Sequence, residues 1–123
     1  MKVRVVTADG QLDAPEAPNG NSEAYKFLDF LVGPGWVMHR LNEELAVASL
    51  LKHDEPSVRN LHAEVLVASI GVPESQQPRL YGDVVFVHWQ APLLSRKPKI
   101  RSLSEHHDVL ITEAFAVMEQ VGA

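Results

Sequence analysis

The pattern of apolar and polar positions is clearest in residues 84–89, VVFVHW, which follow a Gly-Asp turn at residues 82 and 83. β-Branched and aromatic side chains in such a run favour a β-strand. Because alternate residues of a strand face opposite ways, both faces of this segment are apolar except at His88. The pattern therefore predicts a central strand that other elements cover on both sides.

Two further segments show strand periodicity. In residues 2–7 Val3 and Val5 alternate with Lys2 and Arg4, and residues 36–41 alternate in the same way. Both are predicted to be strands.

Residues 43–52 fit two structures equally well. The preceding Asn42, the early acids and the late Lys52 favour a helix on intrinsic propensity. Alternatively, Asn42 and Glu43 form a tight turn and residues 45–51 are the return strand of a hairpin. The residues alone leave this choice open.

Three segments are predicted to be helices, because apolar residues recur at three- and four-residue intervals after a capping side chain. The first begins at Asn21 or Ser22 and ends before Gly33, the second runs from Ser57 to Ile70, and the third covers residues 103–121. The face expected to be buried in the second helix consists of Val58, Leu61, Val65 and Ala68, widened by Leu66 and Ile70. The apolar arc of the third consists of Leu103, Leu110, Ala114, Phe115, Val117, Met118 and Val121, with Asp108 on its polar side.

Two stretches between these elements are predicted to be irregular. Residues 8–22 contain two Pro, two Gly and two Asn, which indicates a mobile surface loop. Residues 90–102 contain Pro92 and Pro98 and are expected to form a basic, extended connector. Residues 1–123 then fit a single α+β domain, a small mixed or antiparallel sheet of three to five strands with two or three helices packed on it.

The composition excludes several kinds of site and indicates the compartment in which the protein is expected. The 123 residues include no cysteine, which excludes disulfides, thiolate metal sites and a cysteine nucleophile. No segment resembles the apolar core of a signal peptide or approaches the roughly 18 apolar residues of a membrane span. We therefore expect a soluble, cytoplasmic protein that does not associate with membranes. The net charge of −5 disfavours a general affinity for nucleic acid, which requires a basic surface.

Candidate chemistry is sparse. No nucleophile elbow, metalloprotease motif or phosphate-binding loop occurs, so no catalytic residue and no cofactor is assigned. His39 and His88 lie in predicted strands and could meet across the sheet, with Glu64 or Asp83 as a third metal ligand. This is the basis of an alternative interpretation, a small metal-dependent enzyme. The simpler interpretation is that both histidines are hydrogen-bonded or exposed sheet residues.

The most distinctive local feature is a basic run, in which Arg96, Lys97, Lys99 and Arg101 fall within six residues. Such a run can bind phosphates or an acidic partner. The simpler interpretation is a solvated linker whose charge protects a sheet edge from pairing. No aromatic residue lies between these basic side chains to stack on nucleobases, so nucleic-acid binding through residues 96–101 is a further, less favoured alternative.

Several short motifs resemble those of a family of small uncharacterised proteins from bacteriophages and plasmids. They are MKVRVVTADG at the start, GPGWVMHRL, Asn60 and Ala63 within RNLHAEVL, and LYGDVVFV near residue 80. That family shows an N-terminal strand, a short helix, a strand hairpin, an N-x-x-A helix and a G-D-V strand. The resemblance covers residues 1 to about 89 and favours the hairpin for residues 43–52. It implies a mobile-element accessory protein and assigns no catalytic residue.

The acidic single domain, the missing catalytic motifs and the resemblance lead to one functional hypothesis: a non-catalytic accessory protein that binds a host or phage protein. The apolar arc of residues 103–121 adds a structural expectation. Because a monomer rarely leaves so large an apolar patch in water, this helix either covers its own sheet or packs on its copy in a homodimer.

Overall fold

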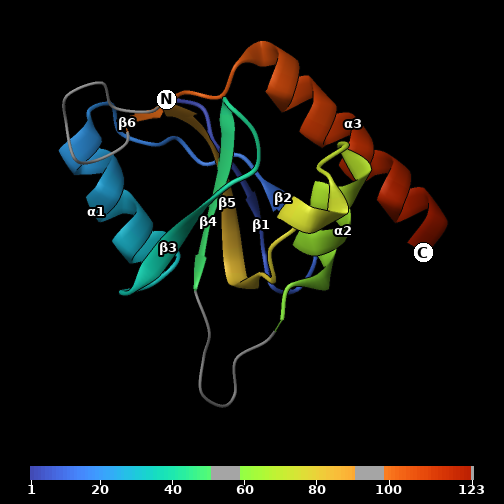
Figure 1. Ribbon diagram of the computed structural model, residues 1–123. Helices are drawn as coiled ribbons and strands as arrows, with labels where there is room; N and C mark the ends of the chain where they lie inside the picture. The colour runs from blue at the N-terminus through green and yellow to red at the C-terminus, as the bar shows by residue number, and fades with distance from the viewer. Residues whose placement is uncertain (51–58, 91–98, 123) are drawn as a thin grey trace.

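The run at residues 84–89 belongs to β5 (Tyr81–Gln90), the central strand of the sheet, as predicted. The structure is a computed structural model that describes residues 1–50, 59–90 and 99–122. The other elements, in chain order, are β1 (Arg4–Val6), β2 (Leu12–Asp13), α1 (Asn21–Leu31), β3 (Trp36–Arg40), β4 (Leu45–Leu50), α2 (Leu61–Ser69), the short 3-10 helix η1 (Glu74–Gln76), β6 (Lys99–Arg101) and α3 (Glu105–Gly122) (Figure 1).

The strands form one antiparallel sheet in the order β2-β1-β5-β4-β3, and β6 pairs with the far end of β5. This confirms the α+β class. The sheet has six strands among the residues described, one more than expected. β2 and β6 are the two strands that the sequence did not predict, since both form in stretches expected to be irregular.

Helices cover both faces of the sheet, as the two apolar faces of β5 require. In Figure 1 α1 lies on one side of the sheet and α2 and α3 lie on the other. Val85 and Val87 pack in a cluster with Leu28 of α1, whereas Phe86 packs in a cluster with Leu66 of α2 and further residues of α3. The alternation of the central strand therefore determines which helix covers which face.

Residues 45–50 are the return strand of a hairpin, so the second of the two interpretations is confirmed for the described part. Asn42 makes the turn, since its Oδ1 accepts hydrogen bonds from the backbone amides of Glu44 and Leu45 at 2.8 Å each. Leu45 through Ser49 are buried on both faces of β4. Burial against two helix layers thus outweighs the helix propensity of this segment. Residues 51 and 52 lie outside the described ranges.

The predicted buried face of α2 is confirmed at Leu66, and Ile70 packs against the core, but it is wrong for Leu61, Val65 and Ala68. The buried residues are Ala63, Leu66 and Val67, while Leu61 and Val65 are 56% and 51% exposed. The helix is apolar around most of its circumference, so periodicity alone could not select a face. Its start also differs, because Asn60 caps the helix by accepting from the amide of Ala63 at 2.9 Å. The predicted cap Ser57 and Val58 lie outside the described residues.

Residues 8–22 are more regular than predicted. β2 pairs with β1, and Lys2 forms an isolated bridge with Glu16. These backbone hydrogen bonds order a stretch that has few apolar side chains to bury. α1 begins at Asn21 after Gly20, and neither predicted side chain caps it; the Asn21 Oδ1 instead accepts from the amide of Ile100 at 2.9 Å.

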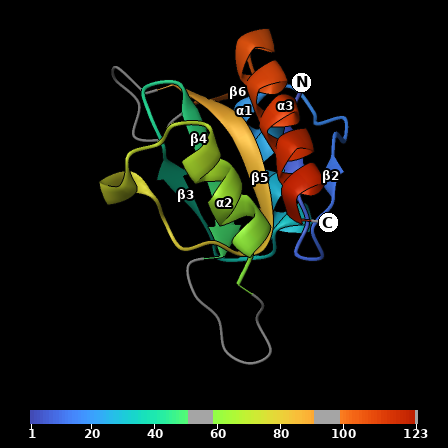
Figure 2. The same ribbon diagram turned by 90° about the vertical axis from the view of Figure 1, so that its right-hand side faces the viewer.

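The C-terminal helix packs on the sheet of its own chain, which is the first of the two placements expected for it. Leu103, Ile111 and Phe115 lie in the core cluster with Phe86, and α3 also contacts α2 (Figure 2). Asp108, predicted to be on the polar side, is buried because Arg4 and Lys2 neutralise it. No helix in the described part of the chain is long and apolar enough to span a membrane.

Candidate binding site around strand β6

The structure brings two of the predicted basic residues, Lys99 and Arg101, onto β6. This strand pairs with the end of β5 in the register His88↔Arg101, Trp89↔Ile100 and Gln90↔Lys99. The predicted connector is therefore a paired strand at this end. Residues 91–98, and with them Arg96 and Lys97, lie outside the described ranges.

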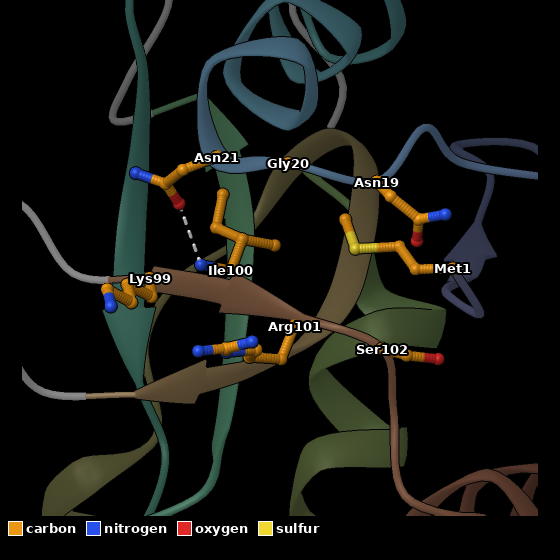
Figure 3. Close-up of a pocket in the computed structure, with 8 residues that line it drawn as sticks. All are labelled: Met1, Asn19, Gly20, Asn21, Lys99, Ile100, Arg101 and Ser102. Atoms are coloured by element: carbon orange, nitrogen blue, oxygen red, sulfur yellow. Dashed lines mark hydrogen bonds between the residues drawn. The ribbon is translucent and has the colours of Figure 1, made fainter.

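A hollow of about 450 Å³ lies beside β6 (Figure 3). It is lined by Met1, Asn19, Gly20, Asn21, Lys99, Ile100, Arg101 and Ser102. No carboxylate is among these residues, and Lys99 and Arg101 supply the charged side chains. We call Lys99, Arg101, Ser102 and this hollow the β6 rim. Its charge suits an anionic ligand.

The β6 rim is held in place by its pairing with β5 and by hydrogen bonds to two other segments of the chain. The Ile100 amide donates to the Asn21 side chain, and the Lys2 amide donates to the Ser102 Oγ at 2.8 Å. The side chain of Ile100 is buried, and in Figure 3 it points toward Gly20 and Asn21 while Lys99 and Arg101 lie on the opposite side of the strand. The cations are therefore carried on a backbone that is fixed on both sides.

Both cations are available to a partner. Lys99 and Arg101 are exposed, and Arg101 Nε donates to the Gln90 Oε1 at 3.0 Å. In residues 1–50, 59–90 and 99–122 neither forms an ion pair with a carboxylate. By contrast, the amino group of Met1 donates to the Ala17 carbonyl at 2.6 Å and lies 3.7 Å from the Glu16 carboxylate.

A second hollow of about 640 Å³ shares Arg101 and Ser102 with the first. Glu43, Glu44, His88, Trp89, Gln90 and Ser104 complete its lining, so its charge is mixed. His107 lies nearby and is buried. Burial lowers the pKa of His107, the charges of His106 and His88 lower it further, and Glu44 opposes them. Near neutral pH the ring is therefore held neutral.

Ser104 and His107 form a helix cap rather than a nucleophile and base. Ser104 Oγ accepts from the backbone amide of His107 at 3.2 Å and lies 3.1 Å from the His107 Nδ1. Both contacts serve the first turn of α3, whose free amides need acceptors. The sequence predicts that Ser102 or Ser104 opens this helix, and Ser104 is confirmed; its contact with the His107 ring was not predicted, although a serine three residues before a polar side chain has the spacing of a capping box.

The structure does not bring His39 and His88 together. Both lie on the α2 side of the sheet, but β4 runs between their strands, so two interstrand spacings of about 5 Å separate them. The proposed third ligands are engaged elsewhere: Glu64 accepts two hydrogen bonds from Arg59 at 2.7 Å, and Asp83 accepts from the amide of Ala8. Within the described residues no three His, Cys, Asp or Glu side chains could hold a metal ion.

Comparison with family models, with curated proteins and with solved structures gave no match.

Proposed function

We propose that the protein is a non-catalytic binding protein that holds an acidic segment of a partner protein on the β6 rim. The observation that carries this proposal is the hollow beside β6, whose charged side chains, Lys99 and Arg101, have no carboxylate partner among the described residues. Two unpaired cations on a fixed backbone attract an anion at little reorganisation cost.

A protein partner fits the charge of the whole chain better than nucleic acid does. The net charge is −5, so a long polyanion would be repelled over most of the surface, whereas a short acidic segment can reach the rim alone. That the partner is a host or phage protein in the cytoplasm is part of the proposal, and its support is the resemblance described above.

Fluorescence anisotropy with a labelled acidic peptide of about eight residues tests the proposal. The Lys99→Gln/Arg101→Gln double variant should bind at least about 5-fold more weakly, since each exposed ionic contact contributes up to about 1 kcal/mol. The Lys26→Gln/Arg79→Gln variant is a matched control, because it makes the same change in net charge at exposed positions elsewhere. It should stay within about 2-fold of the wild type.

Two further binding measurements, a salt titration and a neutral peptide, show which results would contradict the proposal. Binding should weaken as salt rises, and the same peptide with Gln in place of its acids should not bind. The proposal is wrong if both double variants lose affinity equally, since only net charge then matters. It is also wrong if single-stranded DNA binds at low salt while the acidic peptide does not.

A further inference from the structure

β3 is an open edge of the sheet. It is last in the strand order, and no strand in the described part of the chain pairs with its outer side. All five of its residues are at least partly exposed. The opposite end is β2, which is two residues long and is followed closely by Pro15. Short strands protect an edge from further pairing, and β3, at five residues, is longer than β2; Pro34 lies two residues before β3, as Pro15 lies two residues after β2.

The hydrogen-bond pattern shows which groups of β3 face outward. The Leu41 amide donates to the Leu45 carbonyl, so Leu41 and Leu45 form a hydrogen-bonded pair. Such pairs alternate along an antiparallel ladder, and the register pairs His39 with Val47 and Val37 with Ser49. The backbone N–H and C=O groups of Trp36, Met38 and Arg40 therefore point away from β4.

We propose that β3 pairs antiparallel with β3 of a second copy of this chain, about a two-fold axis at Met38. The axis is perpendicular to the sheet, so the two sheets become continuous and α1 of each copy lies on the same face. Met38 then pairs with its own copy, and Trp36 pairs with Arg40 of the other copy at both ends. Each of these three pairs uses the outward-facing backbone groups.

The side chains of this pairing are self-complementary. Trp36 and Arg40 share a face of the strand, so the pairing puts a guanidinium against an indole twice, a favourable cation–π pair. In its own chain Arg40 lies over the ring of Trp89 on β5, with 4.6 Å from its guanidinium carbon to the ring centroid, so the pairing exchanges one cation–π contact for another. Two methionines meet at the axis, and no like charges are opposed. A shift by two residues would separate every Trp36–Arg40 pair.

The complementarity of Trp36 and Arg40 favours a second copy of this chain over an unrelated strand as the partner of β3. A foreign segment would have to supply a cation and an aromatic residue at the matching positions, whereas β3 carries both. The interface is short, so we expect a reversible dimer of micromolar affinity rather than an obligate one.

Sedimentation equilibrium over about 1 µM to 1 mM, with amide hydrogen exchange by NMR, tests the pairing. The amides of Trp36, Met38 and Arg40 should exchange rapidly in dilute protein and become at least about 10-fold protected as the dimer forms, whereas the His39 amide should be protected throughout. Met38→Pro removes an N–H that faces away from β4 and should abolish dimerisation. Arg40→Glu, at an exposed position, should weaken it at least about 10-fold, and Arg79→Glu is the charge-matched control.

A protein that stays monomeric at 1 mM overturns the proposal. So does a dimer in which the Trp36, Met38 and Arg40 amides stay unprotected, or one that Arg40→Glu and Arg79→Glu affect equally, because another surface then makes the contact. Salt separates this proposal from binding at the β6 rim. Screening should strengthen association between two copies of net charge −5 and weaken the hold on an acidic peptide.

Discussion

Replacing Asn60 by Ala should remove a large part of the stability of the protein. Asn60 is fully buried, and its side chain makes three hydrogen bonds. Its Oδ1 caps α2 at the Ala63 amide, and its Nδ2 donates to the carbonyls of Val6 at 2.9 Å and Gly82 at 2.8 Å. One side chain thus ties α2 to β1 and β5.

The expected magnitude follows from these contacts. Loss of the cap costs about 1 kcal/mol. Each carbonyl that loses its donor away from water costs about 1–2 kcal/mol more. We expect Asn60→Ala to lower the free energy of unfolding by about 3–5 kcal/mol, against a total of about 5–15 kcal/mol for a domain. Asn60→Asp keeps the cap acceptor but points a carboxylate at two carbonyls, so it should be no more stable than Asn60→Ala.

Urea unfolding followed by tryptophan fluorescence and circular dichroism measures the change. With a slope of about 1–3 kcal/mol per molar urea, the midpoint should fall by more than about 1 M. Asn42→Ala is a matched control, because it also removes two amide-to-side-chain hydrogen bonds, but at an exposed turn. Its effect should stay below about 1 kcal/mol. A loss of under about 1 kcal/mol for Asn60→Ala would refute the reasoning.

Four further predictions concern stability, each measured by the same unfolding assay. Asp108→Asn should cost about 1–3 kcal/mol, because it leaves Arg4 mostly buried without its carboxylate, whereas Glu113→Gln on the exposed side of α3 should change little. Leu66→Ala should cost about 2–5 kcal/mol and Leu61→Ala far less; equal losses would contradict the buried face of α2 described above. Removing residues 103–123 should abolish cooperative unfolding, and a soluble fragment 1–102 with the wild-type melt would show that α3 is an appendage. Stability should also fall with acidity. Burial lowers the pKa of His39 below its usual 6.5, and the hydrogen bond from Arg4 lowers the pKa of Asp108 below 3.8. In both cases the unfolded chain binds the proton more tightly than the folded chain does, so the group contributes its full stability above its unfolded pKa. The free energy of unfolding should therefore begin to fall below about pH 6.5 because of His39, and fall further below about pH 4 because of Asp108. Greater stability at pH 5.5 than at pH 7.5 would contradict this sign. His39→Gln should reduce the first step, to which His107 also contributes because burial lowers its pKa as well.

The sequence predicted those parts of the fold in which local pattern and burial agree. The two apolar faces of β5 lie under helices on both sides, and β3 and β1 lie within their predicted segments. Prediction failed where tertiary contacts decide. α2 is apolar nearly all round, and its rotation is set by Asn60, whose partners lie far away in the sequence. β2 and β6 exist because neighbouring strands offer them hydrogen bonds, which composition does not reveal.

The same limit applies to the candidate site. The density of charge near residue 100 is the sequence feature that makes Lys99 and Arg101 candidate binding residues, and their role stays a prediction. It could not identify the Asn21 side chain that holds β6, or the neighbouring hollow to which Glu44 and Ser104 contribute, because these residues come from separate elements. The His39–His88 hypothesis used the correct face of the sheet but could not include the intervening strand β4.

The N-x-x-A and G-D-V motifs have structural roles in this chain. Asn60 and Ala63 form the cap of α2, Gly82 supplies a carbonyl to the Asn60 side chain, and Asp83 accepts the amide of Ala8. These contacts join α2, β1 and β5, so a chain that shares the motifs needs only to share this framework. The β6 rim and the edge of β3 use no residue of these two motifs, although β3 is part of GPGWVMHRL and Met1 of MKVRVVTADG lines the hollow. The stability of the fold and the proposed binding at these two surfaces can be tested separately. Asn60→Ala tests the first through stability, whereas Lys99→Gln/Arg101→Gln and Arg40→Glu test the second through affinities that should respond to salt in opposite directions.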